Sequence, residues 1–247
     1  MTTIVPLRSL SNRFSLIATA SLMTVAALST ATTAQQCLIP EKLQLSKTLE
    51  SFELKDAEMI PLSMKDNIVT EVESIRANEM IQRHLGASGV IAYVIRRPGC
   101  VFCREEGVEL MKLAENPVLE GFNFLGIVKE TGVDDEGLLE FGKSYPYPIY
   151  RDADLKFYEA LGNRKLSLET WNPLRIVKGM MWLRDAVKRT ESKNLEGNLK
   201  GEGFLKGGVI IFGKDGTQKY AYAEETFEEF PSSDILAAID VLKKNES

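Results

Sequence analysis

Two cysteines separated by two residues, Cys100 and Cys103, carry the strongest chemical signal in the chain. An apolar run from Val90 to Ile95 precedes them and predicts a buried strand, and the segment from Val101 to about Asn116 has the apolar periodicity of a helix. A cysteine at such a junction lies beside unpaired backbone N–H groups at the positive end of the helix dipole, which favours thiolate over thiol. The spacing also lets the two sulfurs close a disulfide.

This placement predicts different roles for the two thiols. Cys100 would attack a peroxide or a disulfide, and Cys103 would resolve the product into an internal disulfide. Charged side chains of both signs surround the pair, so the net electrostatic effect depends on how they are oriented. These neighbours are Arg96, Arg97, Arg104, Glu105 and Glu106.

Other interpretations of the pair stay open at this point. In an oxidising compartment it could form a structural disulfide. A structural zinc site would need two further ligands, and only Cys37 and His84 remain as soft candidates. His84 is the only histidine, so a histidine-dependent hydrolase is excluded unless His84 itself acts. Cys37 is either an incidental thiol near a processing site or a second resolving cysteine.

The composition narrows the class of protein. The chain has 247 residues, 44% of them hydrophobic, which is enough for a sizeable core, and three cysteines cannot form a disulfide-rich scaffold. A net charge of −5 argues against a nucleic-acid-binding protein, which carries a basic excess or stripe.

The first 36 residues differ from the rest of the chain. Arg8 and Arg13 are present, no acidic residue precedes Glu41, and residues 14–34 are uncharged with small residues near their end. This pattern predicts a cleaved targeting segment over 1–36, for a mitochondrion, a plastid or the secretory pathway. A membrane anchor or a disordered tail are the alternatives, and membrane association is expected only if the segment is retained.

Residues 37–85 predict an N-terminal extension that packs on the core. Charged stretches with spaced apolar residues favour helices over 43–52 and 72–84. The segment 59–69 between them could carry one or two short strands.

The remaining residues, 86–247, alternate between strand and helix patterns. Strands are predicted over 90–95, 122–128, 149–150, 208–212 and 218–223, and helices over 101–116, 136–141, 154–161, 174–187 and 233–244. This order predicts an α/β fold with a mixed sheet flanked by helices. It matches the thioredoxin-like pattern, with a helical insertion over about 150–203 between its two halves.

A glycine-rich stretch, residues 197–203, is followed by Gly207 and Gly208. It lacks the Gly-Lys-Ser/Thr ending of a phosphate-binding loop, and it precedes a strand, whereas dinucleotide fingerprints follow one. A close backbone turn that faces the cysteines fits better. Gly207 and Gly208 are therefore candidate substrate contacts.

The sequence Arg-Arg-Pro-Gly-Cys-Val-Phe-Cys-Arg-Glu-Glu at 96–106 resembles the active-site signature of the peroxiredoxin-like 2 family, within the AhpC/TSA antioxidant group. The blocks at 150–158 and 197–208 and the region of Phe227 resemble further family blocks, so the similarity covers about residues 45–245.

The resemblance implies a thioredoxin-like fold and a redox-active Cys100–Cys103 pair. It also implies antioxidant activity, or the thioredoxin-dependent reduction of lipid endoperoxides found in the prostamide/prostaglandin F synthase branch. The chain departs from typical peroxiredoxins, because neither cysteine ends a Pro-x-x-x-Thr/Ser-x-x-Cys motif. It departs from thioredoxins at Lys206 and Gly207, where those proteins carry a cis-proline.

The prediction is a thiol–disulfide oxidoreductase with peroxidase-like antioxidant activity, with Cys100 as nucleophile, Cys103 as resolving thiol and Arg97 as electrostatic support. This chemistry needs no metal or organic cofactor. The expected partners are a peroxide or disulfide substrate and a thioredoxin- or glutathione-type reductant, and not a nucleic acid. The alternatives are a specific endoperoxide reductase and a redox-sensing binding module without turnover.

Overall fold

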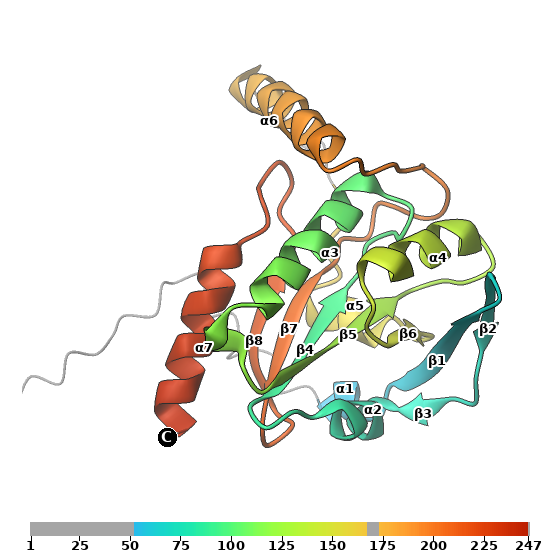
Figure 1. The fold of residues 1–247 in the computed structure, drawn as a ribbon, viewed down its shortest axis with the longest axis vertical. Helices are drawn as coiled ribbons and strands as arrows, with labels where there is room; N and C mark the ends of the chain where they lie inside the picture. The colour runs from blue at the N-terminus through green and yellow to red at the C-terminus, as the bar shows by residue number, and fades with distance from the viewer. Residues whose placement is uncertain (1–51, 167–172, 247) are drawn as a thin grey trace, which may run out of the picture. The chain divides into compact units, whose positions relative to one another are not determined.

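A computed structural model describes residues 52–166 and 173–246 of the chain (Figure 1). The predicted targeting segment 1–36, Cys37 and nearly all of the helix predicted over 43–52 lie outside these ranges. Within them, no helix combines the length and the apolar character needed to cross a membrane.

The described strands form one mixed sheet of eight strands, in the order β2-β1-β6-β5-β4-β7-β8, with β3 paired to β1. The central strand β4 runs parallel to β5 and antiparallel to β7. The strands are β1 (Glu58–Lys65), β2 (Ile68–Glu71), β3 (Ile75–Arg76), β4 (Gly89–Val94), β5 (Phe122–Val128), β6 (Ile149–Asp152), β7 (Gly208–Gly213) and β8 (Gln218–Ala223).

Helices cover both faces of this sheet. Figure 1 shows α3 and α4 across one face with α7 beside them, and α5 behind the strands. The helices are α1 (Phe52–Lys55), α2 (Ala77–His84), α3 (Val101–Ala114), α4 (Asp135–Ser144), α5 (Lys156–Ala160), α6 (Pro173–Ser192) and α7 (Ser232–Glu246), with a 3-10 turn, η2 (Pro117–Leu119).

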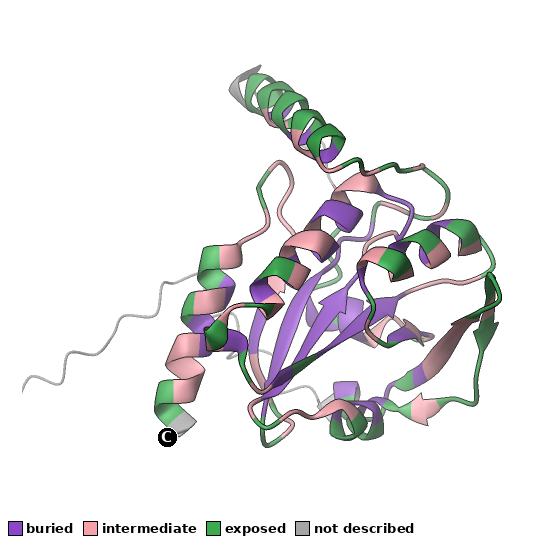
Figure 2. Ribbon diagram, in the orientation of Figure 1, coloured by how far each residue is buried: buried purple, intermediate pink, exposed green. Residues whose placement is uncertain are grey.

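The central strands separate two hydrophobic cores. Ile91, Tyr93 and Ile95 point into the core beneath α3, α4 and α7, whereas Val90 and its alternate neighbours point into the core on the side of α2 and α5. Every residue of β4 and β7 is buried, as the purple strands of Figure 2 show. Full burial of each large aliphatic side chain contributes about 1.5–3 kcal/mol, so this strand is a firm base for the loop that follows it.

The observed topology confirms the thioredoxin-like prediction. One half is β4–α3–β5 and the other is β7–β8–α7, and the segment between them contributes β6, α5 and α6. The added strand β6 pairs with β5 on one side and with β1 on the other. Residues 58–84 are thereby joined to the same sheet.

The helix predicted over 72–84 is only partly correct. Residues 72–74 lie outside any helix or strand, Ile75 and Arg76 form β3, and the helix begins at Ala77. Val72 donates its N–H to Pro61 O at 2.9 Å, and Ile75 pairs with Met59. Ladder hydrogen bonds to β1 therefore override the local helical pattern, since tertiary pairing outweighs intrinsic propensity.

Candidate active site

Cys100 is the residue that caps the N-terminus of α3, directly after the loop that follows β4. Its backbone is extended (φ −74°, ψ 125°), so the helix turns begin at Val101. Both thiols are free; Cys100 is 5% exposed and Cys103, one turn into the helix, is fully buried. The predicted placement of the first sulfur at the positive end of the helix dipole is what the structure shows.

The loop before Cys100 is held in place by close backbone packing. A β-carbon on Gly99 would lie 2.1 Å from Asp134 Oδ2, so only glycine fits between these groups. Asn198 donates its N–H to Gly99 O at 2.6 Å. The buried Arg104 guanidinium donates to Pro98 O at 3.0 Å, and also to the carbonyls of Glu196 and Gly137. Arg104 therefore joins the loop before Cys100 to the first turn of α4 and to the segment that follows α6.

Arg96 is the arginine that reaches the nucleophile. Its Nη2 donates to Cys100 Sγ at 3.4 Å, and its Nε lies 3.2 Å from Glu224 Oε2. The Arg96 and Glu224 side chains are only 10% and 13% exposed, so this ion pair is weakly screened by water. Arg97, the arginine singled out in the sequence, instead donates to Leu199 O at 3.1 Å.

The two thiols differ sharply in acidity. The pKa of Cys100 is lowered to about 5, chiefly by the hydrogen bond from the Cys103 side chain. The charge of Arg96 and the backbone N–H groups of Cys103 and Phe102 lower it further, whereas burial raises it. The pKa of Cys103 is raised, because its hydrogen bond to Cys100 and its burial both favour the protonated thiol. These shifts favour the thiolate at Cys100 and the protonated thiol at Cys103.

A carboxyl group and a phenol lie on the inner side of α3. The Tyr93 hydroxyl is 2.8 Å from Glu106 Oε2 and 3.0 Å from Cys103 O. Burial raises the pKa of Glu106, and the nearby charge of Glu224 raises it further. The pKa of Glu224 is also raised by its burial, although the positive charge of Arg96 opposes this shift. The site thus has one guanidinium, that of Arg96, near several acidic groups, and the pKa values of both carboxyl groups are raised.

A hollow of about 420 Å³ opens beside this cluster, between α3, α6 and the start of α7; we term it the cysteine-side hollow. Its lining includes Phe102, Glu106, Trp182 and Phe230. The Phe102 and Trp182 rings are 5.1 Å apart, so α6 contacts the Cys-x-x-Cys segment directly. Glu105 also binds Arg189 of α6 at 3.0 Å and Lys193, just beyond the end of α6, at 2.8 Å.

The glycine-rich stretch lies against the catalytic loop, as the sequence predicted. A β-carbon on Gly197 would lie 2.7 Å from Val101 N. Gly207 and Gly208 are buried, and β-carbons there would meet Val94 O at 2.1 Å and Tyr222 O at 2.0 Å. These two glycines let backbones approach; their contact with substrate stays a prediction.

His84 lies at the end of α2, where its Nε2 is 2.7 Å from the Tyr150 hydroxyl. Burial lowers the pKa of His84. In the part of the chain that the structure describes, no group of three His, Cys, Asp or Glu side chains is arranged to hold a metal ion.

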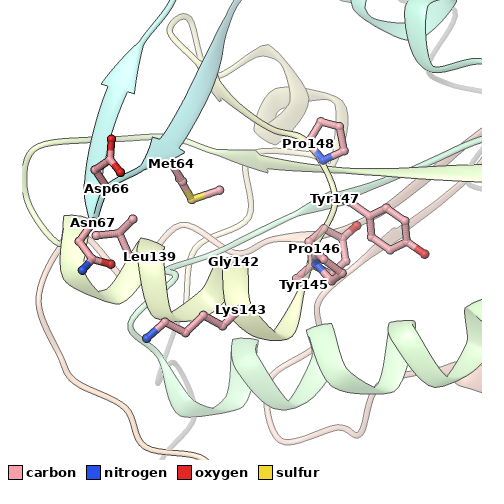
Figure 3. A pocket seen from close by; sticks show the side chains of 10 residues that line it. All are labelled: Met64, Asp66, Asn67, Leu139, Gly142, Lys143, Tyr145, Pro146, Tyr147 and Pro148. Carbon is pink, nitrogen blue, oxygen red and sulfur yellow. The ribbon is translucent and has the colours of Figure 1, made fainter.

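A second hollow, of about 580 Å³, lies between the β1–β2 hairpin and α4 (Figure 3); we term it the hairpin-side hollow. Asp66 and Asn67 at the hairpin tip, Leu139 and Lys143 on α4, and Tyr147 are among its lining residues. It contains neither cysteine and no residue of the segment 96–106.

Sequence analysis missed the roles of Glu224 and Tyr93. Glu224 is 124 residues beyond Cys100, directly after β8, and no local pattern marks it. Tyr93 gave a weak signal: it is a polar-tipped residue in an otherwise aliphatic strand, and buried tyrosines need a partner for their hydroxyl.

Comparisons with known proteins found similarity to one family model, to curated relatives and to solved structures. The model of the family described as AhpC/TSA antioxidant enzyme matches residues 109–226. Peroxiredoxin-like 2A of Rattus norvegicus is 28% identical over 205 residues, covering 83% of this chain and 78% of the relative. Prostamide/prostaglandin F synthase of Salmo salar is 26% identical over 156 residues, covering 62% of this chain and 74% of the relative. The bacterioferritin comigratory protein of Xanthomonas campestris superposes with a TM-score of 0.43 at 13% identity, covering 76% and 92% of the two chains.

Proposed function

We propose that this thiol-dependent oxidoreductase, which resembles the AhpC/TSA antioxidant enzymes and peroxiredoxin-like 2A, reduces a peroxide through its Cys100–Cys103 pair. The pair cycles between dithiol and disulfide. A thioredoxin- or glutathione-type thiol returns the pair to the dithiol.

The cycle has two chemical steps. The Cys100 thiolate attacks one oxygen of the peroxide, the O–O bond breaks, and the other oxygen leaves as an alkoxide or hydroxide that takes up a proton; Cys100 becomes a sulfenic acid. The Cys103 sulfur then attacks Cys100 Sγ, the S–O bond breaks, and water leaves with the Cys103 proton. The pair has lost two electrons to the peroxide, and the reductant supplies them in return.

One observation carries this proposal: the two thiols are held in opposite protonation states by different surroundings. Cys100 lies at a helix N-terminus with Arg96 Nη2 at 3.4 Å from its sulfur, whereas Cys103 is fully buried. A structural disulfide requires no such asymmetry. A nucleophile and a resolving thiol require it, because the thiolate attacks and the second thiol must wait.

A lipid endoperoxide is the second candidate substrate. Similarity to the prostamide/prostaglandin F synthase of Salmo salar supports it, and so does the apolar wall formed by Phe102 and Trp182 in the cysteine-side hollow. Cleaving an endoperoxide O–O bond uses the same two electrons and yields two hydroxyls on one molecule. Rates with hydrogen peroxide and with an endoperoxide, measured side by side, distinguish the two substrates.

The direct test is to oxidise the reduced full-length protein with a small excess of peroxide and to map its thiols by differential alkylation and mass spectrometry. We expect one Cys100–Cys103 disulfide that thioredoxin reopens, with peroxide consumed over many turnovers. A disulfide that forms once and is not turned over would instead favour a redox-sensing module. A pair that stays reduced would overturn the proposal.

A further inference from the structure

One surface of the molecule does not serve the thiol chemistry: the outward face of α6. The face of this helix that packs on the molecule consists of small or half-buried residues, namely Gly179, Trp182, Ala186 and Thr190. A neighbouring face, about a quarter of a turn round the helix, carries an apolar stripe, Ile176, Met180, Leu183 and Val187, whose side chains are 40–66% exposed. We call these four residues the α6 stripe. Figure 2 shows α6 as mostly exposed, projecting past α3.

The spacing shows that the α6 stripe is a continuous surface. Its members follow one another at intervals of four, three and four residues, so they share one side of the helix. Val177 and Met181 extend it, and they are 54% and 54% exposed. Single exposed apolar residues are ordinary, but an unbroken row of this kind marks a surface that contacts something else.

The charges of α6 indicate what that contact is. The helix has five basic and two acidic residues, a net charge of +3, whereas the chain as a whole carries −5. Arg184 and Lys188 each follow a member of the α6 stripe and are exposed. A helix that combines an exposed apolar row with adjoining basic side chains is suited to the boundary of an anionic bilayer, where the row enters the acyl region and the cations meet the headgroups.

A second copy of the chain is a poorer match for this surface. Pairing two α6 stripes would bring the two sets of Arg184 and Lys188 to the edges of the same seam, where like charges repel. An anionic lipid surface turns the same charges into an attraction.

The anchoring of α6 suits a docking element. Its C-terminal end is tied to α3 by Arg189 and, just beyond the helix, by Lys193, both of which contact Glu105. The apolar residues precede this anchor, between positions 176 and 187. We propose that α6 docks the protein on membranes that carry anionic lipids, with the α6 stripe inserted at the interface and Trp182 on its inner side against Phe102.

The experiment is co-sedimentation of the full-length protein with vesicles of phosphatidylcholine, alone or mixed with phosphatidylserine. We expect stronger binding to the mixed vesicles, weakened by added salt. The Met180→Glu/Leu183→Glu variant should lose at least about tenfold in partitioning, because charged side chains at these positions would have to enter the acyl region. Arg184→Gln/Lys188→Gln should lose about fivefold for each basic residue removed, and only on mixed vesicles.

The matched control is Ile68→Glu/Val72→Glu, which alters two exposed apolar residues near the β1–β2 hairpin and should bind as the unaltered protein does. Circular dichroism and the Cys100 thiolate absorbance check that each variant is folded.

Two results would overturn the proposal. Undiminished binding of Met180→Glu/Leu183→Glu would place the lipid contact elsewhere in the chain. A dimer in the absence of vesicles, which this variant converts to a monomer in light scattering, would show that a second copy covers the α6 stripe.

Discussion

The hairpin-side hollow and the cysteine-side hollow, both in the described part of the chain, differ in a way that size does not reveal. The hairpin-side hollow is the larger, about 580 Å³ against about 420 Å³, yet it is lined by Pro146, Pro148, Tyr147 and the hairpin tip and contains no nucleophile. The cysteine-side hollow is lined by Phe102, Glu105 and Glu106 of α3, the helix whose N-terminus carries Cys100, and burial raises the pKa of Glu106. The reactive place in this fold is recognised by charge and by helix geometry, not by volume.

The two regions differ in how far their charged groups are exposed to water. Around Cys100, one guanidinium is shared between a thiolate and Glu224 with little exposure to water, so removing any member changes the protonation of the others. Around the hairpin-side hollow, ion pairs such as Lys143–Glu140 are exposed and contribute little. Substitutions on the two sides should therefore have very unequal effects.

The largest effect is expected at the thiols themselves. Cys100→Ser should lower peroxide turnover by at least about a thousandfold, because a serine hydroxyl is not ionised at neutral pH. Cys103→Ser should still consume one equivalent of peroxide and then stop as a Cys100 sulfenic acid, which dimedone labels for mass spectrometry. If Cys103→Ser turned over normally, an external thiol would be the resolving group.

Arg96 should have the next largest effect, and Arg97 is its matched control. Arg96→Gln should raise the pKa of Cys100 from about 5 by about one to three units, the range for loss of an opposite charge at this distance. The thiolate absorbance near 240 nm, followed against pH, measures this directly. Arg97→Gln removes a donor to Leu199 O only, so the Cys100 titration should not move.

The sign of the pH dependence follows from the depressed pKa. Alkylation of Cys100 should be nearly constant at neutral pH and should fall as the pH drops through about 5. The same ionisation stabilises the folded state above the unfolded pKa of 9.0, and this stability is lost as the pH falls through about 5.

Arg96→Gln also removes the ion-pair partner of the buried Glu224 and leaves it the Gly207 N–H as donor, at a cost of about 3–5 kcal/mol in the free energy of unfolding. Adding Glu224→Gln should recover much of that stability without restoring the low pKa of Cys100. Recovery of both would mean that Arg96 acts only through packing.

The sequence predicted the scaffold better than it predicted the charges. Strands such as 218–223 and the placement of the cysteine pair follow from apolar patterns that can be recognised within a few consecutive residues. Arg96, and not the adjacent Arg97, turns toward Cys100 because it pairs with Glu224. The pairing of β8 with β7 brings Glu224 to this position. The direction in which Arg104 points depends in the same way on distant segments, because two of its three carbonyl partners belong to Gly137 and Glu196.

Glu106 should have a smaller effect that separates catalysis from stability. Burial raises its pKa above the ordinary 4.5, so the folded state keeps a proton that the unfolded chain releases, and stability falls as the pH rises above 4.5. Glu106→Gln should flatten this fall. It should also change the rate of Cys100–Cys103 disulfide formation a few fold at alkaline pH, where the lost charge no longer raises the pKa of Cys103.

The matched control for Glu106 is Asp152, whose pKa burial raises to about 6 and which caps α5 through the N–H groups of Lys156 and Phe157. Asp152→Asn should flatten the stability curve between about pH 4 and 6 by the same linkage, yet leave the rate of disulfide formation unchanged. Equal effects of both substitutions on that rate would assign Glu106 a structural role.

The smallest effect is expected where the molecule is most open. Leu139→Trp should fill part of the hairpin-side hollow and leave peroxide turnover within about twofold, because none of its lining groups touches the thiols. Ser233→Trp, which fills the cysteine-side hollow, should raise KM for a bulky organic peroxide but not for hydrogen peroxide, since only the larger substrate needs that space. Steady-state kinetics of both variants with both peroxides tests these two expectations. If Leu139→Trp impaired the bulky substrate and Ser233→Trp did not, the larger hollow would be the substrate site, and the thiols would have to be reached from the hairpin side.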